Sequence, residues 1–312
     1  MKPRPFLRFQ KKILSLPGVR AIAPDSWYLR VLYRVKTGDV LRLNPPVTFN
    51  EKINWLKLHD RDPRYTALVD KYAVREYVAD KIGQERLIPL VGGPYNSFDE
   101  IDFDALPKAF VLKCAHDSGS VAVCPDKAAF DRAAAKKRLD RAMRKNFYWA
   151  AREYPYKRVP RRIVAEKLLT NASGGDLVDY KFFCFNGKAR CVMFCSRRFS
   201  KEGLRVTFYD PDWNMLPFER HYPREERPAP KPETLGEMTA LAETLAEGIP
   251  FVRVDFYDVD GRIYFGELTF YPGGGLEEFK PKEWDVTFGN WLELPPPRRR
   301  GSSCNCNKGI NL

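Results

Sequence analysis

The chain has 312 residues, of which 44% are hydrophobic and 13% aromatic, so it can bury a sizeable core and form one large or two to three small domains. This composition excludes a disordered chain, and an odd number of cysteines, seven, scattered over such a length excludes a small disulfide-stapled domain and indicates a reducing compartment. The 53 lysines and arginines exceed the 40 acids by 13, which favours an anionic partner: a nucleotide, a charged glycan, an anionic membrane or a nucleic acid.

Residues 1–47 are expected to form an N-terminal extension. They are basic, but they contain no apolar run long enough for the core of a signal peptide, and no stretch of the chain approaches the ~20 apolar residues of a membrane span. We therefore expect a cytoplasmic protein without a transmembrane segment. Residues 6–15 could form a short basic amphipathic helix, which would either pack on the domain or touch the inner leaflet of the membrane.

Two helices are expected next, over about 48–60 and 65–82. Thr48 and Glu51 have the spacing of a capping box, which opens the first helix. The second helix carries Lys71, with another basic residue one turn later on the same face. Like charges at this spacing repel each other, so either water screens them or an anion such as a phosphate lies between them.

A strand, a small polar loop and a second strand are expected over residues 109–124. The first strand carries Lys113, and the loop Ser118-Gly119-Ser120 offers backbone N–H groups and hydroxyls without bulk. Such a loop beside a strand lysine can cradle phosphate oxygens, although serine–glycine turns are also common in ordinary hairpins. It is not a P-loop, because the chain has no GxxxxGK[ST] motif.

Helices and strands are expected to alternate through the middle of the chain. The predicted elements are a helix at 126–146, a strand at 162–169, a hairpin of strands 178–185 and 188–194 closed by Asn-Gly, a strand at 204–209 and a helix at 233–247. Lys181 lies between aromatic residues, where a lone lysine is costly unless its ammonium reaches water or an anion. Residues 295–312 have no apolar periodicity and are expected to be disordered.

A last hairpin, within residues 253–275, carries Asp255 and Glu267 on either side of a glycine-containing turn. A three-residue loop at 259–261 would place residue 253 opposite 267 and put both acids on one face, whereas a two-residue loop would send Glu267 to the other face. On one face the acids would lie within reach of a common Mg²⁺, which is commonly held by one or two carboxylates together with phosphates and water. The alternative is that both acids are solvated positions on an exposed sheet face.

Six segments, in this order, resemble the TupA-like branch of the ATP-grasp superfamily over about residues 40–294. They are PPVTFNEKINWLKLHDRDPRY, DKYAVREYV, FVLKCAHDSGS, IVAEKLL, DYKFFCFNGK and the hairpin VRVDFY with YFGELTFYPGGG. The resemblance implies an α+β fold in which two subdomains clasp ATP, with a helical N-terminal extension. The expected parts are the extension at 1–47, a helical part at 48–108, a small lid subdomain at 109–170 and a C-terminal subdomain with the catalytic hairpin at 171–294.

The resemblance also implies which residues bind ATP and Mg²⁺. Lysines would contact the phosphates, the loop at 116–120 would cover them, and Glu166 with its neighbours would face the adenine and ribose. The implied ATP-binding residues are Lys71, Lys113, His116, Ser118, Gly119, Ser120, Glu166, Lys167, Leu168 and Lys181, and the implied magnesium-binding residues are Asp255, Glu267 and Thr269. Thr269 stands where many ATP-grasp enzymes have an asparagine, and its hydroxyl can still bind the metal or position a water.

The chemistry implied is ATP-dependent ligation of a carboxylate to an amine through an acylphosphate, with Lys181 and Arg253 as catalytic residues. Arg197, Arg198 and Arg253 are candidates for gripping the acceptor carboxylate. The branch is associated with bacterial cell-wall and capsular polysaccharide assembly. An amino acid or peptide would therefore be joined to a uronic-acid glycan, as in a teichuronopeptide, with no role for nucleic acid.

Two other functions remain open on the sequence alone. A kinase would use the same ATP site but transfer the γ-phosphoryl group to a sugar hydroxyl, and it would need a general base near that hydroxyl. A non-catalytic basic module that binds an anionic glycan or nucleic acid would explain the charge of +13 but not the two acids of the last hairpin.

Overall fold

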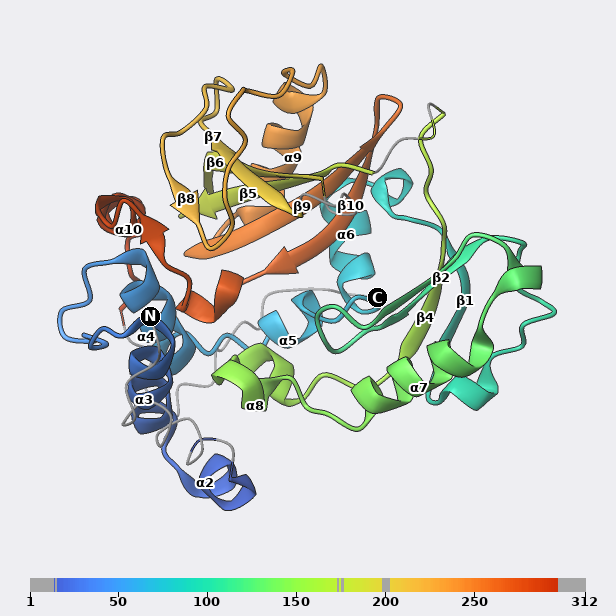
Figure 1. The fold of residues 1–312 in the computed structure, drawn as a ribbon, viewed down its shortest axis with the longest axis horizontal. Helices are drawn as coiled ribbons and strands as arrows, with labels where there is room; N and C mark the ends of the chain where they lie inside the picture. The colour runs from blue at the N-terminus through green and yellow to red at the C-terminus, as the bar shows by residue number, and fades with distance from the viewer. Residues whose placement is uncertain (1–13, 15, 173, 175–176, 198–202, 297–312) are drawn as a thin grey trace, which may run out of the picture.

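The computed structural model describes residues 14, 16–172, 174, 177–197 and 203–296, which form two main antiparallel sheets flanked by helices (Figure 1). The five-stranded sheet lies at the upper left of Figure 1 and the four-stranded sheet at the right. The predicted α+β class is confirmed. Most of the helix predicted at 6–15 and the tail from 297 on lie outside the described residues. Within the described part of the chain, no helix has both the length and the apolar character needed to cross a membrane.

The large sheet is formed by segments rich in β-branched and aromatic residues, as expected for strands. Its strands lie in the order β10 (Arg262–Thr269), β9 (Phe251–Val259), β5 (Asp179–Phe185), β6 (Lys188–Ser196) and β7 (Arg205–Tyr209). One face packs on α9 (Leu235–Ala246), where the thiol of Cys184 reaches the carbonyl of Ala242. The other face packs at one end against α4 (Phe49–His59) and α10 (Glu283–Trp291) and carries polar residues at its other end.

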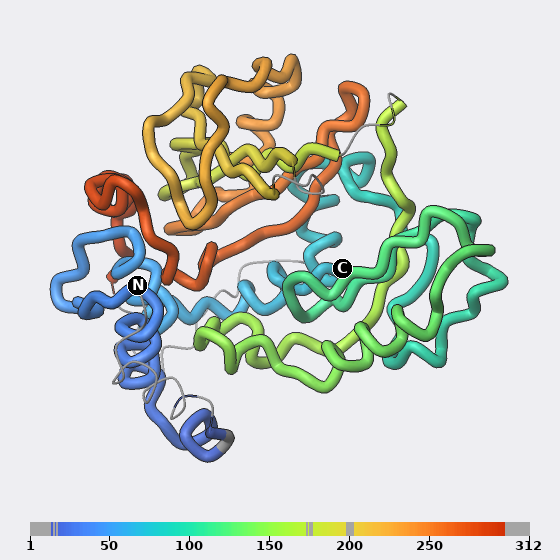
Figure 2. The backbone as a smooth tube through the Cα atoms, viewed as in Figure 1, coloured from blue at the N-terminus to red at the C-terminus, as the bar shows by residue number. Residues whose placement is uncertain are grey.

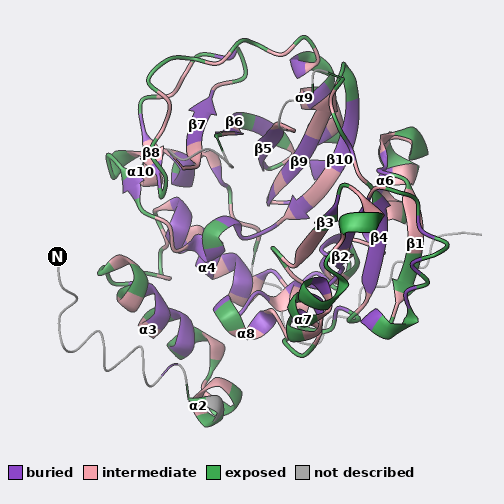
Figure 3. Ribbon diagram, turned by 45° about the vertical axis from the view of Figure 1, so that its right-hand side comes forward, coloured by how far each residue is buried: buried purple, intermediate pink, exposed green. Residues whose placement is uncertain are grey.

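The small sheet is covered on one side by α7 (Arg132–Met143), whose outer surface is exposed while β4 is buried (Figure 3). Its strands lie in the order β1 (Leu90–Tyr95), β4 (Ile163–Lys167), β2 (Phe110–Cys114) and β3 (Val121–Cys124). Because β1 belongs to this sheet, the small subdomain begins before residue 109, the boundary expected from the sequence. The helix predicted at 126–146 is shorter, because Asp131 caps α7 after a separate 3₁₀ turn, η3 (Lys127–Ala129).

The N-terminal helices are α2 (Pro17–Ile22), α3 (Asp25–Thr37) and α4. Helix α4 packs on the C-terminal helix α10 and α3 adjoins α4, whereas α2 lies at the far end of this group (Figure 2). The predicted capping box of α4 is present, because Thr48 accepts a hydrogen bond from the backbone of Glu51 and the Glu51 carboxylate accepts one from the backbone of Thr48. The ammonium of Lys52 donates to two carbonyls at the end of α10, at 2.8 and 2.7 Å, and ties the two helices together.

The single helix predicted at 65–82 is broken in two. The pieces are α5 (Tyr65–Leu68) and α6 (Val74–Ile82). Between them, the carboxylate of Asp70 accepts hydrogen bonds from backbone N–H groups of the following turn, which favours a turn over a continuous helix. The break places Lys71 in the turn, where its backbone N–H donates to the carbonyl of Ala115 beside the loop of the small sheet.

Short elements complete the fold. They are η1 (Gln84–Arg86), η2 (Phe98–Glu100), α8 (Tyr148–Ala151), η4 (Tyr154–Lys157), η5 (Pro272–Gly275) and the two-stranded sheet of β8 (Glu219–Arg220) and β11 (Phe279–Lys280).

Strands β9 and β10 meet at a two-residue turn, so the three-residue loop expected from the sequence is wrong. Val259 pairs with Arg262, and the turn residues Asp260 and Gly261 have φ of 53° and 81°. Positive φ at both positions is typical of the tight turn that matches the twist of a hairpin.

The two acids nevertheless share a face, because the pairing of β9 and β10 slips at Gly266. With unbroken alternation, a two-residue turn would point Glu267 away from Asp255. The slip adds one residue to β10, a β-bulge, after which Glu267 pairs with Asp255 and Thr269 with Arg253. The expected pairing of residue 253 with 267 is therefore replaced by a direct pairing of the two acids.

Phe49, the first residue of α4, lies at the centre of an aromatic cluster that joins α4 and α10 to the large sheet. Its ring is fully buried. Five other phenylalanine rings have centroids within 6.5 Å of it, those of Phe183, Phe185, Phe251, Phe279 and Phe288. Ring pairs at these separations add to the burial energy, so the cluster is expected to hold the N-terminal helices in place.

Phe49→Ala is expected to lower the free energy of unfolding by about 3–5 kcal/mol, because it removes a fully buried ring and leaves a cavity. Urea-induced unfolding followed by circular dichroism measures this change. Val123→Ala serves as the control, since Val123 is 55% exposed and its truncation is expected to change the free energy by no more than about 0.5 kcal/mol. Equal effects of the two substitutions would contradict the central role of Phe49.

Candidate functional site

Lys181, Asp255 and Glu267 stand side by side on three neighbouring strands of the large sheet. The register pairs Lys181 of β5 with Asp255 of β9, and Asp255 with Glu267 of β10. The three side chains therefore share one face, the face that α9 leaves uncovered. The ammonium of Lys181 forms an ion pair with Asp255 and lies 3.4 Å from a carboxylate oxygen of Asp179.

Arg253 of β9 links the two acids. Its Nε donates to Oδ1 of Asp255 at 2.6 Å, and its Nη2 donates to Oδ2 of Asp255 at 2.7 Å and to Oε1 of Glu267 at 3.0 Å. The guanidinium expected to grip an acceptor carboxylate is thus already bound to two carboxylates of the protein. Its role toward a substrate stays a prediction.

Lys181, which lies between aromatic residues, pairs with the carboxylate of Asp255. Burial would lower the pKa of Lys181, but the nearby carboxylates, Asp255 above all, outweigh burial and raise that pKa. Lys181 therefore keeps its positive charge at neutral pH. Asp255 and Asp179 already compensate its charge, so a phosphate that entered the site would share the ammonium with these carboxylates.

Glu267 is the more accessible acid of the two, since 32% of its side chain is exposed against 4% for Asp255. Burial would raise the pKa of Glu267, but four cations outweigh it and lower the pKa to about 2, namely Lys71, Arg253, Lys181 and Lys113. Because Lys113 belongs to the small sheet and Lys71 to the turn before it, Glu267 faces cations from both sides of the molecule. It stays ionised throughout the physiological pH range.

Lys113 of β2 and Glu166 of β4 form an ion pair on the small sheet. Their Nζ and Oε2 atoms lie 2.5 Å apart, and both side chains are largely buried. Of the residues that follow Glu166, Lys167 is exposed and Leu168 half-buried. These two residues lie close to the apolar cluster of Ile88, Leu169 and Tyr264 that joins the two sheets.

The loop at 116–120 is anchored at one end and exposed at the other. The ammonium of Lys71 donates to the carbonyl of Asp117, and Ser118 and Gly119 are exposed. His116 is buried, and its Nε2 lies 3.2 Å from the carbonyl of Ala142 in α7. The His116 ring therefore points into the small subdomain, and this residue anchors the loop where the resemblance implies an ATP contact.

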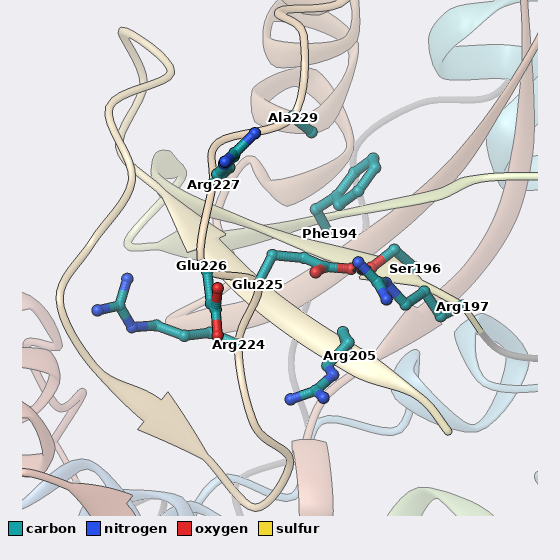
Figure 4. A pocket seen from close by; sticks show the side chains of 9 residues that line it. All are labelled: Phe194, Ser196, Arg197, Arg205, Arg224, Glu225, Glu226, Arg227 and Ala229. Atoms are coloured by element: carbon teal, nitrogen blue, oxygen red, sulfur yellow. Dashed lines mark hydrogen bonds and ion pairs between the residues drawn. The ribbon is translucent and has the colours of Figure 1, made fainter. Parts of the chain in front are cut away.

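Arg197 lies in a cavity of about 590 Å³ at the β6–β7 edge of the large sheet, which we call the arginine cavity (Figure 4). Its Nε pairs with a carboxylate oxygen of Glu225 at 2.7 Å. Arg205, Arg224 and Arg227 also line this cavity.

The arginine cavity opens on the face of the sheet opposite to Lys181. Phe194, which lines the cavity, pairs with Tyr180, the neighbour of Lys181 on β5. Neighbouring residues of a strand point to opposite faces. The structure therefore does not bring Arg197 to Asp255, and Arg198 lies outside the described residues.

A smaller cavity, of about 310 Å³, adjoins Glu267, and we call it the inner cavity. Arg253, Glu267 and Thr269 line one side of it. Ser118 of the predicted phosphate loop also lines it. The other lining residues include several that the sequence did not single out, among them Phe147, Glu153, Tyr156 and Tyr271. No sequence pattern marks Glu153, an isolated acid between an arginine and a tyrosine.

Helix α4 holds the glycine run that follows β10 against this cavity. Lys57 donates to the carbonyl of Gly274 at 2.6 Å, and Asn54 donates to the carbonyl of Gly275 at 2.8 Å. Residues 273–275 have φ of 61°, 63° and 60°, which glycine adopts without strain. Buried polar residues of α4 thus shape the cavity wall beside Glu267.

The donor set near Glu267 fits a Mg²⁺ ion that arrives with phosphates. Within the described ranges, no three or more histidines, cysteines or acids are grouped as ligands, so the protein alone does not cage a metal. Mg²⁺ is commonly bound by one or two carboxylates, with phosphate oxygens and waters completing an octahedron. Asp255 and Glu267 would supply the carboxylates, and the hydroxyl of Thr269 lies 3.5 Å from Glu267. Both carboxylate oxygens of Asp255 already accept hydrogen bonds from Arg253 or Lys181, so Glu267 is the more available of the two acids.

Comparison with known proteins found one matching family and several similar structures. The profile of the TupA-like ATPgrasp family matches residues 51–293. The ATP-grasp ligase PsnB with a minimal precursor, Mg and ADP is 12% identical, with a TM-score of 0.38 over 88% of this chain and 74% of its own. D-alanine–D-alanine ligase from Bacillus anthracis complexed with ATP is 13% identical, with a TM-score of 0.37 over 73% of this chain and 58% of its own.

A third structure is N5-carboxyaminoimidazole synthase from Aspergillus clavatus, 12% identical with a TM-score of 0.40, which is matched over 65% of this chain and 44% of its own. A second PsnB structure is matched over 54% of its length, so the chain spans about half the length of several of these enzymes. Comparison with curated proteins found no match.

Asp255→Asn is expected to destabilise the protein more than Glu267→Gln does. Asp255 is buried and partners both Arg253 and Lys181, so neutralising it is expected to lower the free energy of unfolding by about 3–5 kcal/mol. Glu267 is partly exposed, so water screens the attraction of the four cations that lower its pKa, and its neutralisation is expected to cost about 1–2 kcal/mol. Urea-induced unfolding of both variants measures the difference, and a larger loss for Glu267→Gln would contradict this assignment of roles.

Proposed function

The chain belongs to the TupA-like ATP-grasp family, and from this membership we propose that it is an ATP-dependent ligase that joins a carboxylate to an amine through an acylphosphate. The observation that carries the proposal is the meeting of charges from the two sheets. The positive charges of Lys71 and Lys113, on the side of the small sheet, lower the pKa of Glu267 on the large sheet. Lysines and carboxylates that meet in this way suit the phosphates and the metal of Mg²⁺–ATP.

ATP would lie between the two sheets. Lys71, Lys113 and Lys181 would bind its phosphates, and the exposed part of the loop at 116–120 would cover them. Glu166, Lys167 and Leu168 would lie beside the adenine and ribose, where the two sheets join. Asp255, Glu267 and Thr269 would hold Mg²⁺, which neutralises charge on the transferring phosphoryl group.

In the ion pairs described above, a phosphate of the nucleotide could replace the carboxylate as a partner of each lysine. Lys113 pairs with Glu166 and Lys181 with Asp255, so both ammonium groups are held in place and charged. A phosphate oxygen can take over part of each pairing, because a lysine has three donors. The charges of the site would therefore need little reorganisation when a triphosphate binds. Charges that are held in place before the reaction are the basis of electrostatic catalysis.

The reaction has two steps, neither of which needs a protein nucleophile. First, an oxygen of the acceptor carboxylate attacks the γ-phosphorus of ATP, the bond to the β–γ bridging oxygen breaks, and ADP leaves with the electron pair. Second, the amine nitrogen attacks the carbonyl carbon of the acylphosphate, the carbon–oxygen bond to phosphate breaks, and the nitrogen loses protons to give the amide. Lys181 and Arg253 would stabilise the charge that develops in both steps.

The acceptor class that fits best is an anionic glycan containing a uronic acid, with an amino acid or peptide as the amine donor, in the assembly of a cell-surface polysaccharide. The formal charge of +13 and the arginine cavity both support an acidic substrate. We place the reaction in the cytoplasm, where ATP is available. The arginine cavity would contact the glycan at a distance from the reacting carboxylate, because it opens on the other face of the large sheet.

Trapping with hydroxylamine is expected to give an acyl-hydroxamate when the protein is incubated with ATP, Mg²⁺ and a panel of uronates. Hydroxylamine captures the acylphosphate, and the ferric complex of the hydroxamate is read by its absorbance. Formation of a stable phospho-sugar with consumption of ATP and no hydroxamate would instead establish a kinase.

Lys113→Met provides the matched test of the site in this assay. It removes a cation that we assign to the phosphates, so hydroxamate formation is expected to fall by about a hundredfold or more. Lys108→Met is the control, since Lys108 is exposed on the surface of the same subdomain. Equal activity of the two variants would exclude the assigned role of Lys113.

Arg205→Glu is expected to raise the KM for a polymeric uronate by about tenfold, because it removes a charge-assisted contact in the arginine cavity. The KM for a monomeric uronate is expected to stay unchanged, since the monomer does not extend to that cavity. Lys137→Glu, at an exposed position of α7, controls for the change in net charge. Steady-state kinetics with both acceptors decides, and an equal rise for monomer and polymer would remove the glycan contact from the proposal.

A further inference from the structure

Glu153 is a buried carboxylate that has no partner within the described chain. It follows α8 and precedes η4, and only 7% of the residue is exposed. Among the described residues, its side chain accepts no hydrogen bond and forms no ion pair. The residue lines the inner cavity together with Arg253, Glu267 and Thr269. A carboxylate that is buried, unpaired and turned to a cavity indicates a ligand that supplies the missing positive charge.

The nearest buried cation of the protein does not fill this role. Lys57 is fully buried, but its ammonium donates to the carbonyl of Gly274 at 2.6 Å and to Oδ1 of Asn54 at 3.2 Å, without reaching ion-pair distance of Glu153. Its charge acts on Glu153 only through space. The guanidinium of Arg253 is bound to Asp255 and Glu267. Both local cations are therefore engaged elsewhere.

The residues that line the inner cavity, and its volume, indicate the size and polarity of the rest of the ligand. Aromatic and apolar residues form most of the wall near Glu153, namely Phe147, Ala150, Ala151, Tyr156, Tyr271 and Leu276. The cavity volume of about 310 Å³ suits a single small molecule of amino-acid size. Its other side is Glu267, one of the residues that we assign to the metal and phosphates. A group bound here would lie next to the reacting phosphoryl group.

We propose that the inner cavity is the site of the amine donor, and that Glu153 binds the ammonium of this donor and accepts its proton before the attack. This inference rests on the proposed ligase function. In the step, R–NH₃⁺ and the carboxylate of Glu153 give R–NH₂ and the carboxylic acid. The nitrogen lone pair then forms the C–N bond at the acyl carbon as the C–O bond to phosphate breaks, and the second proton on nitrogen leaves with the product phosphate.

The electrostatics of the cavity support this role. Burial raises the pKa of Glu153 to about 7, against the opposing effect of the Lys57 charge. A proton acceptor is most effective when its pKa lies near the working pH. Glu267, on the other side of the same cavity, stays ionised and cannot take up a proton at neutral pH. The two acids therefore have different tasks in one cavity.

The experiment compares two nucleophiles on Glu153→Gln. Both reactions contain ATP, Mg²⁺ and a uronate that gives hydroxamate with the wild type. One receives an equimolar mixture of the twenty common amino acids, whose amines are ammonium ions at neutral pH, and the other receives hydroxylamine, which is largely uncharged there. Glu153→Gln is expected to lower amide formation, measured by mass spectrometry, about a hundredfold, and to leave hydroxamate formation within about twofold.

Each result has a definite meaning. Hydroxamate formation by Glu153→Gln shows that the variant folds and makes the acylphosphate. Glu278→Gln, at an exposed position, is the control and is expected to match the wild type in both reactions. Equal loss of both products in Glu153→Gln, no loss of either, or hydroxamate without any amide in the wild type would each overturn the assignment of the amine site. Absence of hydroxamate from the wild type would overturn the ligase function itself, which separates the two failures.

Discussion

The β-bulge at Gly266 is the constraint on which the site depends. A two-residue turn alone would place Glu267 on the α9 face of the large sheet, and Asp255 would then face only cations. The slip in pairing returns Glu267 to the face of Asp255 and Lys181. A Cβ at position 266 would lie 3.1 Å from the carbonyl oxygen of Asp255 and 3.2 Å from the ring of Tyr257, so glycine permits the close approach of the two strands there.

Charge balance explains why this face can be both buried and polar. Asp255 compensates Lys181 and Arg253, and Asp179 lies beside Lys181, so the buried charges are held in pairs. Glu267 is the more exposed member, and the charges of Lys71 and Lys113 act on it from the side of the small sheet. A cluster of this kind contributes little net stability, because desolvation offsets attraction. It does provide fixed charges of both signs at the point where the two sheets meet.

Local patterns in the sequence predict much of this fold, and long-range geometry accounts for what they miss. The capping box at Thr48 and the Asn-Gly hairpin follow from nearby residues. The shared face of Asp255 and Glu267 was also predicted, but from the wrong register, because the only sign of the bulge in the sequence is one glycine. The sequence does not show that Arg197 and the acids lie on opposite faces of the large sheet, because that depends on how the strands assemble. Glu153 could not be identified, because the burial of an isolated acid is a property of its tertiary neighbours.

The inner cavity illustrates how one fold gives two carboxylates opposite properties. Four cations lower the pKa of Glu267 to about 2, whereas burial, opposed only by the charge of Lys57, raises the pKa of Glu153 to about 7. A carboxylate that never protonates suits a metal ion, and one that protonates readily suits an amine that must lose a proton. The separation arises from the subdomain arrangement, because the lysines near Glu267 come from the small-sheet side, while the walls around Glu153 come from α8 and the segment after β10. In the reaction that we propose, the positions of the two acids would order the steps along the cavity, with phosphoryl transfer at Glu267 and amide formation toward Glu153.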